Sequence, residues 1–518
     1  MTSYFRPEWT CGRYNSRHHV ALMYNLLEGV AHFFDDLSAD VVSIILNTPI
    51  NEDIDYEKLL EVAGLSDEEV TCFMEQLLNV GLITTFIPEK KDIDQYREYV
   101  YKWRCSHNFA TDQESNSQEE TPLELSTAEM RYANALEDEG IITSVMFELT
   151  YNCSERCIHC YNIGATRNDT EVSGRNLPSE LGLEDYKRVI DELYEQGLVK
   201  VCLSGGDPFS KPCVWDVIDY LRFKGIAFDI FTNGQRLVGS EARLAGYYPR
   251  LVGVSIYSAE SQVHDKITRI NGSLRKSEMV MERLCRLGVP LNLKCCVMRL
   301  NVKTYRTVVT IAKKYNAVPQ IEVNLTDSIE GDKCVSNYLR LSEREFDVIL
   351  RDRNVPLYVG PESRYFHGAE RHLSDNACGA GKHSVCLTPD GDIIPCCTFH
   401  YSFGNVKNCS VFDILKSKNR KWWLSCTLEK YKDCARHDYC SYCNLCPGVN
   451  FSEHRTPLFA GENNCFLAKV RCNLARKLMK GDDPLKGRTI DEAIKNMPDP
   501  EIGSIRRMTN NERKADAQ

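Results

Sequence analysis

The chain has 518 residues, 26% of them charged, and a formal net charge of −10 at pH 7. This length predicts about three domains, and the acidic balance disfavours general nucleic-acid binding. The chain has 24 cysteines, and half of them follow residue 377. This number exceeds what core packing requires, but the cysteine density is too low for a small secreted disulfide scaffold. Residues 1–16 lack the apolar core of a signal peptide, and no apolar run of about 18 residues could span a membrane. We therefore expect a cytoplasmic protein, with no membrane or nucleic-acid partner, whose cysteines are metal ligands.

Residues 1–88 predict a small domain of short helices. Apolar residues and caps indicate helices at 39–46, 56–63 and 67–80, followed by a strand at 82–87. Three short helices with β elements at both ends are typical of a winged-helix fold. The third helix contains no Lys or Arg and several acidic residues, so DNA phosphates would repel it.

Residues 89–140 are mostly polar and predict a linker, in which the run 111–121 has no apolar residue and is expected to be disordered. A regular alternation follows. Strands are expected at 141–149, 198–203, 226–231, 251–257, 291–298 and 320–325, and helices at 183–196, 214–223, 276–287 and 302–315. Six strands separated by helices predict an α/β fold with a parallel sheet.

The first expected strand ends in a loop with three closely spaced cysteines, Cys153, Cys157 and Cys160. A 4Fe–4S cluster is usually held by four thiolates, so three leave one iron open to a small molecule. A zinc loop is the alternative. One βα unit later comes Gly205-Gly206-Asp207-Pro208, where two glycines allow a ligand to approach the backbone at the strand ends where α/β sheets bind ligands.

The CxxxCxxC loop, with His159 in the aromatic position, resembles the signature of the radical S-adenosylmethionine (SAM) superfamily. The Gly-Gly-Asp segment resembles that family's GGE motif. This resemblance implies a partial (β/α)6 barrel over 141–330, in which the open iron binds SAM and one electron cleaves it to a 5′-deoxyadenosyl radical. It implies cluster ligation and catalysis by the three cysteines. It also places eight residues near SAM: Tyr151, His159, Gly205, Gly206, Asp207, Pro208, Ser255 and Arg269, the last of which could equally be a surface charge.

After a bridging region at 331–369, residues 370–470 resemble the SPASM domain, which carries two auxiliary clusters in peptide-modifying radical SAM enzymes. Its first part, CX9-15GX4C, matches from Cys378 to Cys396, with the turn of an expected hairpin at Pro389-Asp390-Gly391-Asp392. The second part of the SPASM pattern is not fully matched, because Tyr431 stands where a ligand cysteine is expected. By resemblance we assign one cluster to Cys378, Cys386, Cys396 and Cys446. The other would use Cys434, Cys440 and Cys465, with Cys443 or Cys426 as the fourth ligand; a structural zinc site remains open. Residues 471–518 form a tail.

The N-terminal pattern resembles the PqqD-like recognition element, which binds the leader of a ribosomal precursor peptide by strand addition to a sheet edge. Together these resemblances imply a peptide maturase that forms a thioether or carbon–carbon cross-link in a ribosomal precursor peptide and receives electrons from a flavodoxin or ferredoxin. A radical SAM epimerase, a sulfatase-type maturase and a zinc-binding winged-helix regulator are the alternatives. Cys397, beside Cys396, is either a redox or acid/base residue or a packed thiol.

Overall fold

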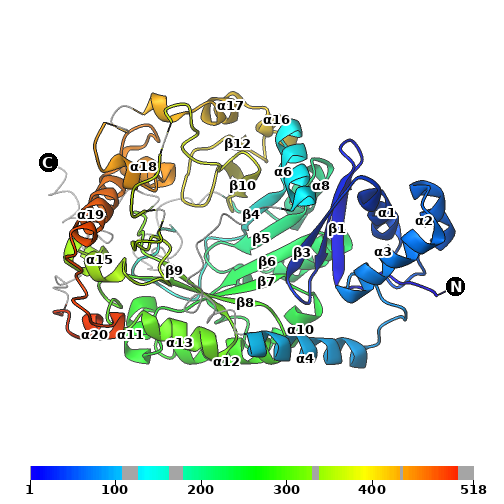
Figure 1. Cartoon of the computed structure of the whole chain (residues 1–518), viewed down its shortest axis with the longest axis horizontal. Coiled ribbons are helices and arrows are strands. Elements are labelled where there is room, and N and C mark those ends of the chain that lie inside the picture. The colour runs from blue at the N-terminus through cyan, green and yellow to red at the C-terminus, as the bar shows by residue number, and fades with distance from the viewer. Residues whose placement is uncertain are drawn as a thin grey trace.

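The computed structural model describes residues 2–107, 126–162, 179–328 and 338–499, apart from residues 364, 371, 432, 433 and 435. Two sheets organise these residues. A three-stranded sheet with the order β1-β2-β3 lies near the N-terminus, and a nine-stranded sheet with the order β12-β11-β10-β4-β5-β6-β7-β8-β9 forms the centre (Figure 1). No helix of the described residues is long and apolar enough to cross a membrane.

The N-terminal domain consists of three antiparallel strands, β1 (Thr10–Asn15), β2 (Val20–Asn25) and β3 (Val30–Asp35), followed by three helices. The helices α1 (Asp36–Asn47), α2 (Tyr56–Ala63) and α3 (Asp67–Asn79) confirm the sequence prediction. The strand predicted at 82–87 is wrong. Only Thr84 pairs there, in an isolated bridge with Phe5, because Phe86 and Ile87 are 52% and 53% exposed and no neighbouring strand covers them.

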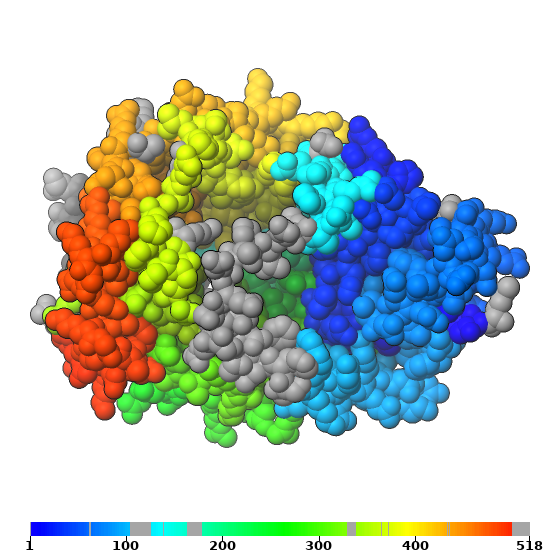
Figure 2. Space-filling view, in the orientation of Figure 1, coloured from blue at the N-terminus to red at the C-terminus, as the bar shows by residue number. Residues whose placement is uncertain are grey.

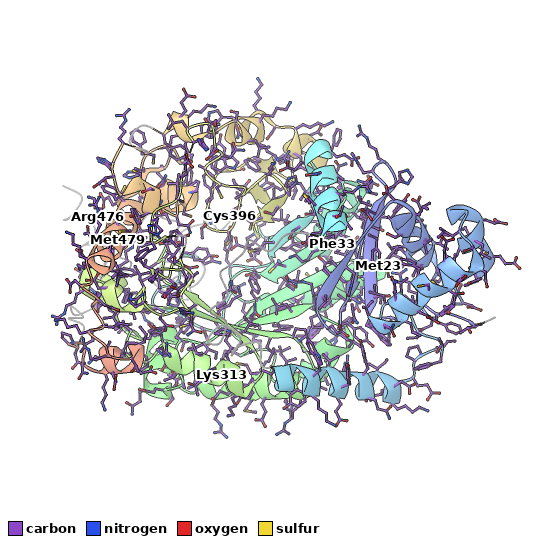
Figure 3. The ribbon with its side chains drawn as sticks, viewed as in Figure 1. Met23, Phe33, Lys313, Cys396, Arg476 and Met479 are labelled. Atoms are coloured by element: carbon purple, nitrogen blue, oxygen red, sulfur yellow. The ribbon has the colours of Figure 1, made fainter. Side chains whose placement is uncertain are left out.

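Both faces of the N-terminal sheet are covered. Met23 and Phe34 pack against α1, α2 and α3 on one face, while Leu22 and Phe33 belong to the cluster on the other face (Figure 3). That second cluster also contains residues from α4 (Lys90–His107), from α6 (Thr127–Glu139) and from the barrel, including Tyr248. The sheet therefore lies between its own helices and the barrel. Only its two edges, along β1 and β3, are left uncovered by the described residues.

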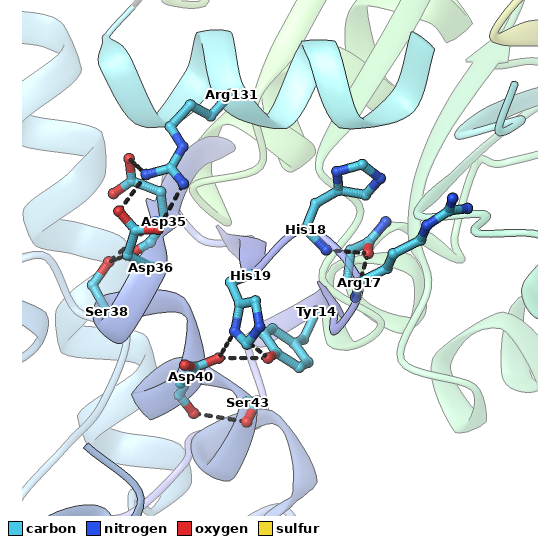
Figure 4. A network of polar contacts seen from close by, with 11 residues as sticks. Tyr14, Arg17, His18, His19, Asp35, Asp36, Ser38, Asp40, Ser43 and Arg131 are labelled. Carbon is cyan, nitrogen blue, oxygen red and sulfur yellow. Dashed lines mark hydrogen bonds and ion pairs between the residues drawn. The ribbon is translucent and has the colours of Figure 1, made fainter. Parts of the chain in front are cut away.

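Helix α6 is fastened to the N-terminal domain by a polar network (Figure 4). The Arg131 guanidinium donates to Asp35 at 3.2 Å and to Asp36 at 2.6 Å, and Glu139 of α6 accepts from the Asn15 side chain at 3.3 Å. The interval 89–140, expected as a polar linker, thus contains the packed helices α4 and α6. Their sequences are polar because each helix buries a narrow stripe of residues. The run 111–121 lies outside the described residues.

The central sheet confirms the predicted parallel strands. They are β4 (Ser144–Glu148), β5 (Lys200–Ser204), β6 (Ala227–Thr232), β7 (Leu251–Ser255), β8 (Leu291–Cys296) and β9 (Val318–Glu322). The predicted helices are present as α8 (Leu183–Glu195), α9 (Val214–Phe223), α12 (Ser273–Arg286) and α13 (Arg306–Lys314). Two short helices were not predicted, α10 (Glu241–Gly246) and α11 (Ser261–Thr268).

Alternate residues of the central strands join the main hydrophobic core, among them Phe147, Leu203 and Val254. Because side chains alternate along a strand, the residues between them, such as Glu148, Ser204 and Ser255, face the other side of the curved sheet. Figure 2 shows a hollow near the centre of this face, in which some green atoms of the barrel segment are visible. Polar and sulfur-containing side chains therefore line the concave side of the barrel.

The cysteine-rich domain continues the same sheet. The predicted hairpin is confirmed: β10 (Ser384–Leu387) and β11 (Asp392–Ile394) are antiparallel, and β11 pairs with β12 (Gly404–Asn405). The sequence did not predict that β10 pairs in parallel with β4 of the barrel. The remaining helices are α15 (Glu343–Ile349), α16 (Val411–Leu415), α17 (Lys418–Leu424), α18 (Pro447–His454), α19 (Glu462–Met479) and α20 (Ile490–Lys495). Helix α19 runs across the boundary expected at residue 470.

Candidate functional site

The three-cysteine loop begins directly after β4, at the carboxyl ends of the parallel strands. The Asn233 side chain donates to the Cys153 sulfur at 3.3 Å, and the Glu155 N–H donates to it at 3.4 Å. The Cys157 thiol donates to Glu155 at 3.4 Å. Burial raises the pKa of Cys153 to about 12 and that of Cys160 to about 11. Three neighbouring thiols, of which Cys153 receives two N–H donors, fit an iron–sulfur cluster, whose irons would compensate the thiolate charge.

The Gly-Gly-Asp segment is bonded to the cysteine loop. The Gly206 N–H donates to the Thr150 carbonyl at 2.7 Å, and the Asp207 N–H donates to the Asn152 carbonyl at 3.0 Å. A Cβ atom on Gly206 would lie 2.3 Å from the Asn152 oxygen. A Cβ on Gly205, whose φ is +123°, would lie 2.6 Å from the Thr150 oxygen. Both positions therefore require glycine, and they bring backbone groups close to where the resemblance expects SAM.

Asp207 has a structural task that the sequence did not reveal. Its carboxylate is fully buried and accepts from the Thr232 hydroxyl at 2.6 Å, the Asn233 N–H at 2.9 Å and the Phe209 N–H at 3.0 Å. Burial raises its pKa, and these donors oppose the rise. Pro208 follows as the first residue of a short 3₁₀ helix. Asp207 therefore fixes Asn233, the residue that donates to Cys153.

The other residues expected near SAM are distributed differently. His159 packs its ring edge-on against Tyr257, with the ring centroids 4.8 Å apart, and burial lowers its pKa to about 4. The Tyr151 hydroxyl donates to Asp390 at 3.0 Å and so ties the cysteine loop to the turn of the β10–β11 hairpin. Ser255 ends β7 on the concave side, and Arg269 is exposed beside α11.

Two carboxylates near the loop escaped sequence reasoning. Glu180 accepts from the Tyr151 N–H at 2.8 Å and from Lys211 at 3.0 Å, which anchors the loop to the segment after Pro208. Glu148 is 1% exposed, and burial raises its pKa to about 7. Its partner is the Tyr161 hydroxyl at 3.4 Å. Neither carboxylate belongs to a spaced motif, so only the fold identifies them.

The first auxiliary group forms around Cys396, which Figure 3 places beside β10. Electrostatic interactions link Cys396 to Cys378, and Cys446 to both of them. Gly448 permits this approach, since a Cβ there would lie 2.8 Å from the Thr398 oxygen. Cys386 is buried within β10, and its sulfur interacts with Glu148, Cys397 and Cys396. These electrostatic interactions connect the four expected cysteines through Cys396, and Cys386 also interacts with Glu148 of β4.

The second auxiliary group lines one cavity of about 380 Å³, with Cys434, Cys440, Cys443 and Cys465 in its walls. His437 also lines it, whereas Cys426 does not. Among the described residues, no three His, Cys, Asp or Glu side chains converge closely enough to hold a single metal ion. Sulfurs spread around a cavity suit a four-iron cluster better than one tetrahedral zinc ion.

Tyr431, which replaces the expected cysteine, lies near both auxiliary groups. It is 3% exposed, and its electrostatic neighbours include Cys434 of the second group and Cys378 and Cys446 of the first. Burial raises its pKa above its ordinary value. Its hydroxyl is buried without a hydrogen-bond partner among the described residues. The ring therefore packs beside Cys434 and Cys443, and Cys443 is the fourth cysteine that lines the cavity.

Comparison with known proteins agrees with this geometry. The model of the radical SAM superfamily matches residues 147–310, and the SPASM model, an iron–sulfur cluster-binding domain, matches residues 378–447. The subtilosin biosynthesis protein AlbA of Bacillus subtilis is 26% identical over 338 residues, 62% of this chain and 70% of AlbA. The mycofactocin maturase MftC of Mycobacterium tuberculosis is 27% identical over 292 residues, 52% of this chain and 71% of MftC.

Two solved structures show the same fold. SuiB of Streptococcus suis bound to SAM has a TM-score of 0.50 at 13% identity and covers 89% of this chain and 99% of its own. The protein anSMEcpe with bound SAM has a TM-score of 0.50 at 15% identity, covering 68% of this chain and 98% of its own.

Proposed function

The chain belongs to the radical SAM superfamily and carries an iron–sulfur SPASM domain, and from this premise we propose that it matures a ribosomally synthesised precursor peptide. AlbA is named for the biosynthesis of the bacteriocin subtilosin and MftC as a mycofactocin maturase, and the PqqA peptide cyclase of Methylocella silvestris is 23% identical over 64% of this chain. The proposed product is a peptide with a new thioether or carbon–carbon cross-link.

The observation that carries the proposal is the adjacency of the cysteine loop and the auxiliary cysteines. Tyr161 directly follows Cys160, hydrogen-bonds Glu148 at 3.4 Å and interacts with Cys397 and Cys386. A peptide on the concave side of the barrel would therefore meet both sites at once. This arrangement suits a reaction in which a substrate radical forms and then loses an electron.

The chain's own residues hold and orient the reacting groups. Cys153, Cys157 and Cys160 would hold the catalytic cluster, and Asn233 would hydrogen-bond one of its thiolates. The chemistry that this cluster and SAM supply is one-electron cleavage of SAM, followed by removal of a hydrogen atom from the peptide. The backbone at Gly205 and Gly206 would bind SAM, and the buried Glu148 carboxyl, with its pKa near 7, could take the proton that leaves the substrate.

We assign leader binding to the N-terminal domain. Because both faces of its sheet are buried, a leader could pair only along an edge. The β3 edge is favoured: Val30 on β3 is 44% exposed and Leu37 on α1 is 47% exposed, and Phe34 contacts Phe73 of α3 with ring centroids 6.1 Å apart. Deleting residues 1–88 would uncover apolar barrel residues such as Ala227, so point variants are the better test.

The first experiment measures iron, sulfide and SAM cleavage under dithionite on anaerobically reconstituted protein. About twelve irons and 5′-deoxyadenosine formation are expected for three clusters, and C153A, C157A and C160A should each abolish cleavage. Peptides encoded beside this chain are then assayed for a mass change. Zinc without iron, or no SAM cleavage, would refute the proposal.

The second experiment compares V30D/L37D with I50D, which alters a residue that is 42% exposed in the same domain. The double variant should bind the precursor peptide that shows a mass change in the first experiment about tenfold or more weakly. Cleavage of SAM in the absence of peptide should be unchanged. Equal binding by both variants would exclude the β3 edge.

A further inference from the structure

A lysine in the middle of β8 faces the concave side of the barrel. Lys294 stands between Leu293 and Cys295, which both belong to the main hydrophobic core. Because side chains alternate along a strand, Lys294 faces the opposite side of the sheet, together with Asn292 and Cys296. Its side chain is only partly buried, so a molecule on the concave side can reach it.

Neighbouring strands make room for this side chain and hold it in one place. Gly253 of β7 provides the room, because a Cβ atom there would lie 2.7 Å from the Lys294 Cε atom and 2.8 Å from the Phe231 ring. The Lys294 ammonium lies over the Phe231 ring, 3.4 Å from the ring centroid, and donates to the Gln320 side chain at 2.8 Å. Phe231 belongs to β6 and Gln320 to β9, so the ammonium is held over the concave face.

The ammonium of Lys294 has donor capacity beyond these contacts. An ammonium group has three N–H donors, and among the described residues its hydrogen-bond acceptor is the Gln320 oxygen. Gln320 carries no charge, and its side chain is exposed. A carboxylate that enters the concave side would therefore receive charge-assisted hydrogen bonds from Lys294, which are stronger than the bond to a neutral amide.

The carboxylate that interacts with Lys294, that of Asp229, is paired with other cations. It accepts from the Arg250 guanidinium and lies 3.9 Å from the Lys200 ammonium. Three cationic side chains therefore surround one carboxylate. Burial lowers the pKa of Lys294, and Asp229 opposes this only in part. The other titratable neighbours of Lys294 are the thiols of Cys202, Cys296 and Cys397.

Lys294 lies one layer below the catalytic loop. Cys296 is two residues further along β8, about 7 Å away, and interacts electrostatically with Cys160. Cys397 interacts both with Lys294 and with Tyr161, the residue that follows Cys160. A peptide residue that reaches the catalytic loop from the concave side would therefore come within a side-chain length of Lys294.

We propose that Lys294 binds a carboxylate of the core peptide and thereby selects peptides with an aspartate or glutamate side chain at or beside the modified residue. This inference rests on the proposed function and names a substrate class for it. The ammonium holds the carboxylate by charge-assisted hydrogen bonds, while Phe231 and Gln320 hold the ammonium. The carboxylate at the end of a peptide has the same chemistry, so the test separates these two sources.

The test uses the full-length reconstituted protein and the precursor peptide that shows a mass change in the first experiment. Synthetic precursors replace each acidic core residue in turn by its amide, Asp by Asn and Glu by Gln, and one further precursor carries a C-terminal amide. Each peptide is assayed with wild type, K294M, K294Q and the control K276M, which removes the same charge from an exposed residue of α12. The values of kcat and KM for the mass change are measured, and equilibrium dialysis gives the SAM affinity.

With wild type and K276M, one amide substitution in the core should lower kcat/KM about tenfold or more. K294M and K294Q should show a similar loss with the unsubstituted precursor, and the same amide substitution should then cost them nothing further. Such a double-mutant cycle isolates the contact between the two groups.

Four results would overturn the proposal. They are wild type that tolerates every amide substitution or modifies a core without acidic residues, losses that add in the cycle, coupling of Lys294 to the C-terminal amide alone, and SAM affinity that falls tenfold in both Lys294 variants. The first of these needs no variant, so a variant that fails to fold leaves the proposal open to refutation. Wild type that changes the mass of no precursor would instead refute the proposed function, so the two failures are distinguishable.

Discussion

A single methyl group at Gly206 should weaken SAM binding through a collision with the cysteine loop. In the G206A variant the new Cβ would lie 2.3 Å from the Asn152 oxygen, whereas real Cβ atoms essentially never approach closer than 3.0 Å. The backbone of the cysteine loop must then retreat by about 0.7 Å. Neither partner is a flexible side chain, so overpacking should cost about 1–3 kcal/mol. If that cost falls on the SAM-bound form, SAM affinity drops by a factor of about 5–150.

The matched control is G246A. Gly246 ends α10, and a Cβ there would meet no atom within 4 Å, so this variant adds the same methyl group without a collision. Equilibrium dialysis with radiolabelled SAM gives the affinities, and iron analysis gives the cluster content, to which each affinity is referred because Asn152 adjoins Cys153. Wild-type SAM affinity in G206A would refute the assignment of this backbone to SAM.

Three further predictions concern individual side chains. C443A should lose about four irons per chain while C426A loses none, and Y431C should restore them in the C443A background; iron loss only in C426A would reverse the ligand assignment. D207N should leave a buried N–H without an acceptor and destabilise the barrel by about 1–3 kcal/mol, seen as a lower denaturant midpoint. Burial lowers the pKa of His264 from 6.5 to about 4. The stabilisation of the folded state by the neutral His264 is therefore complete above pH 6.5 and is lost as the pH falls towards 4. Wild type should therefore lose about 3 kcal/mol more stability than H264N over that interval in urea titrations; parallel pH profiles would contradict this.

The barrel could be predicted from the sequence because apolar residues recur along its helices and strands with a clear helical or strand period. Helix α8, for example, buries Tyr186, Val189, Ile190 and Leu193 on one face. The strands β1–β3 escaped prediction for the opposite reason. All six residues of β2 are buried, since helices cover one face and the barrel the other. The resulting run Val-Ala-Leu-Met-Tyr-Asn shows no alternation of polar and apolar residues.

Some residues of the candidate site could likewise be predicted from the sequence, and others could not. The cysteine loop and the Gly-Gly-Asp segment could be found because their residues are close in the sequence. Glu148, Glu180 and Tyr161 could not, because their roles depend on which strand ends meet at one edge of the sheet. The sequence alone did not identify the fourth cysteine of the second auxiliary group, because both Cys443 and Cys426 were compatible with the spacing. Cys443 lines the same cavity as Cys434, Cys440 and Cys465, whereas Cys426 does not, which supports Cys443 as the proposed fourth ligand.

The parallel pairing of β10 with β4 explains why the two cysteine-rich regions need each other. Cys386 is in register with Met146 of β4, and Met146 is in register with Cys202 of β5. Neighbouring strands are about 4.8 Å apart, so the backbone ladder fixes the auxiliary cysteine beside the strand that delivers the catalytic loop. The bond between Tyr151 and Asp390 fastens the same two regions a second time at the strand ends. Loss of the hairpin would therefore open the edge of β4 and release the cysteine loop, which makes the SPASM domain a structural part of the catalytic barrel as well as a carrier of clusters.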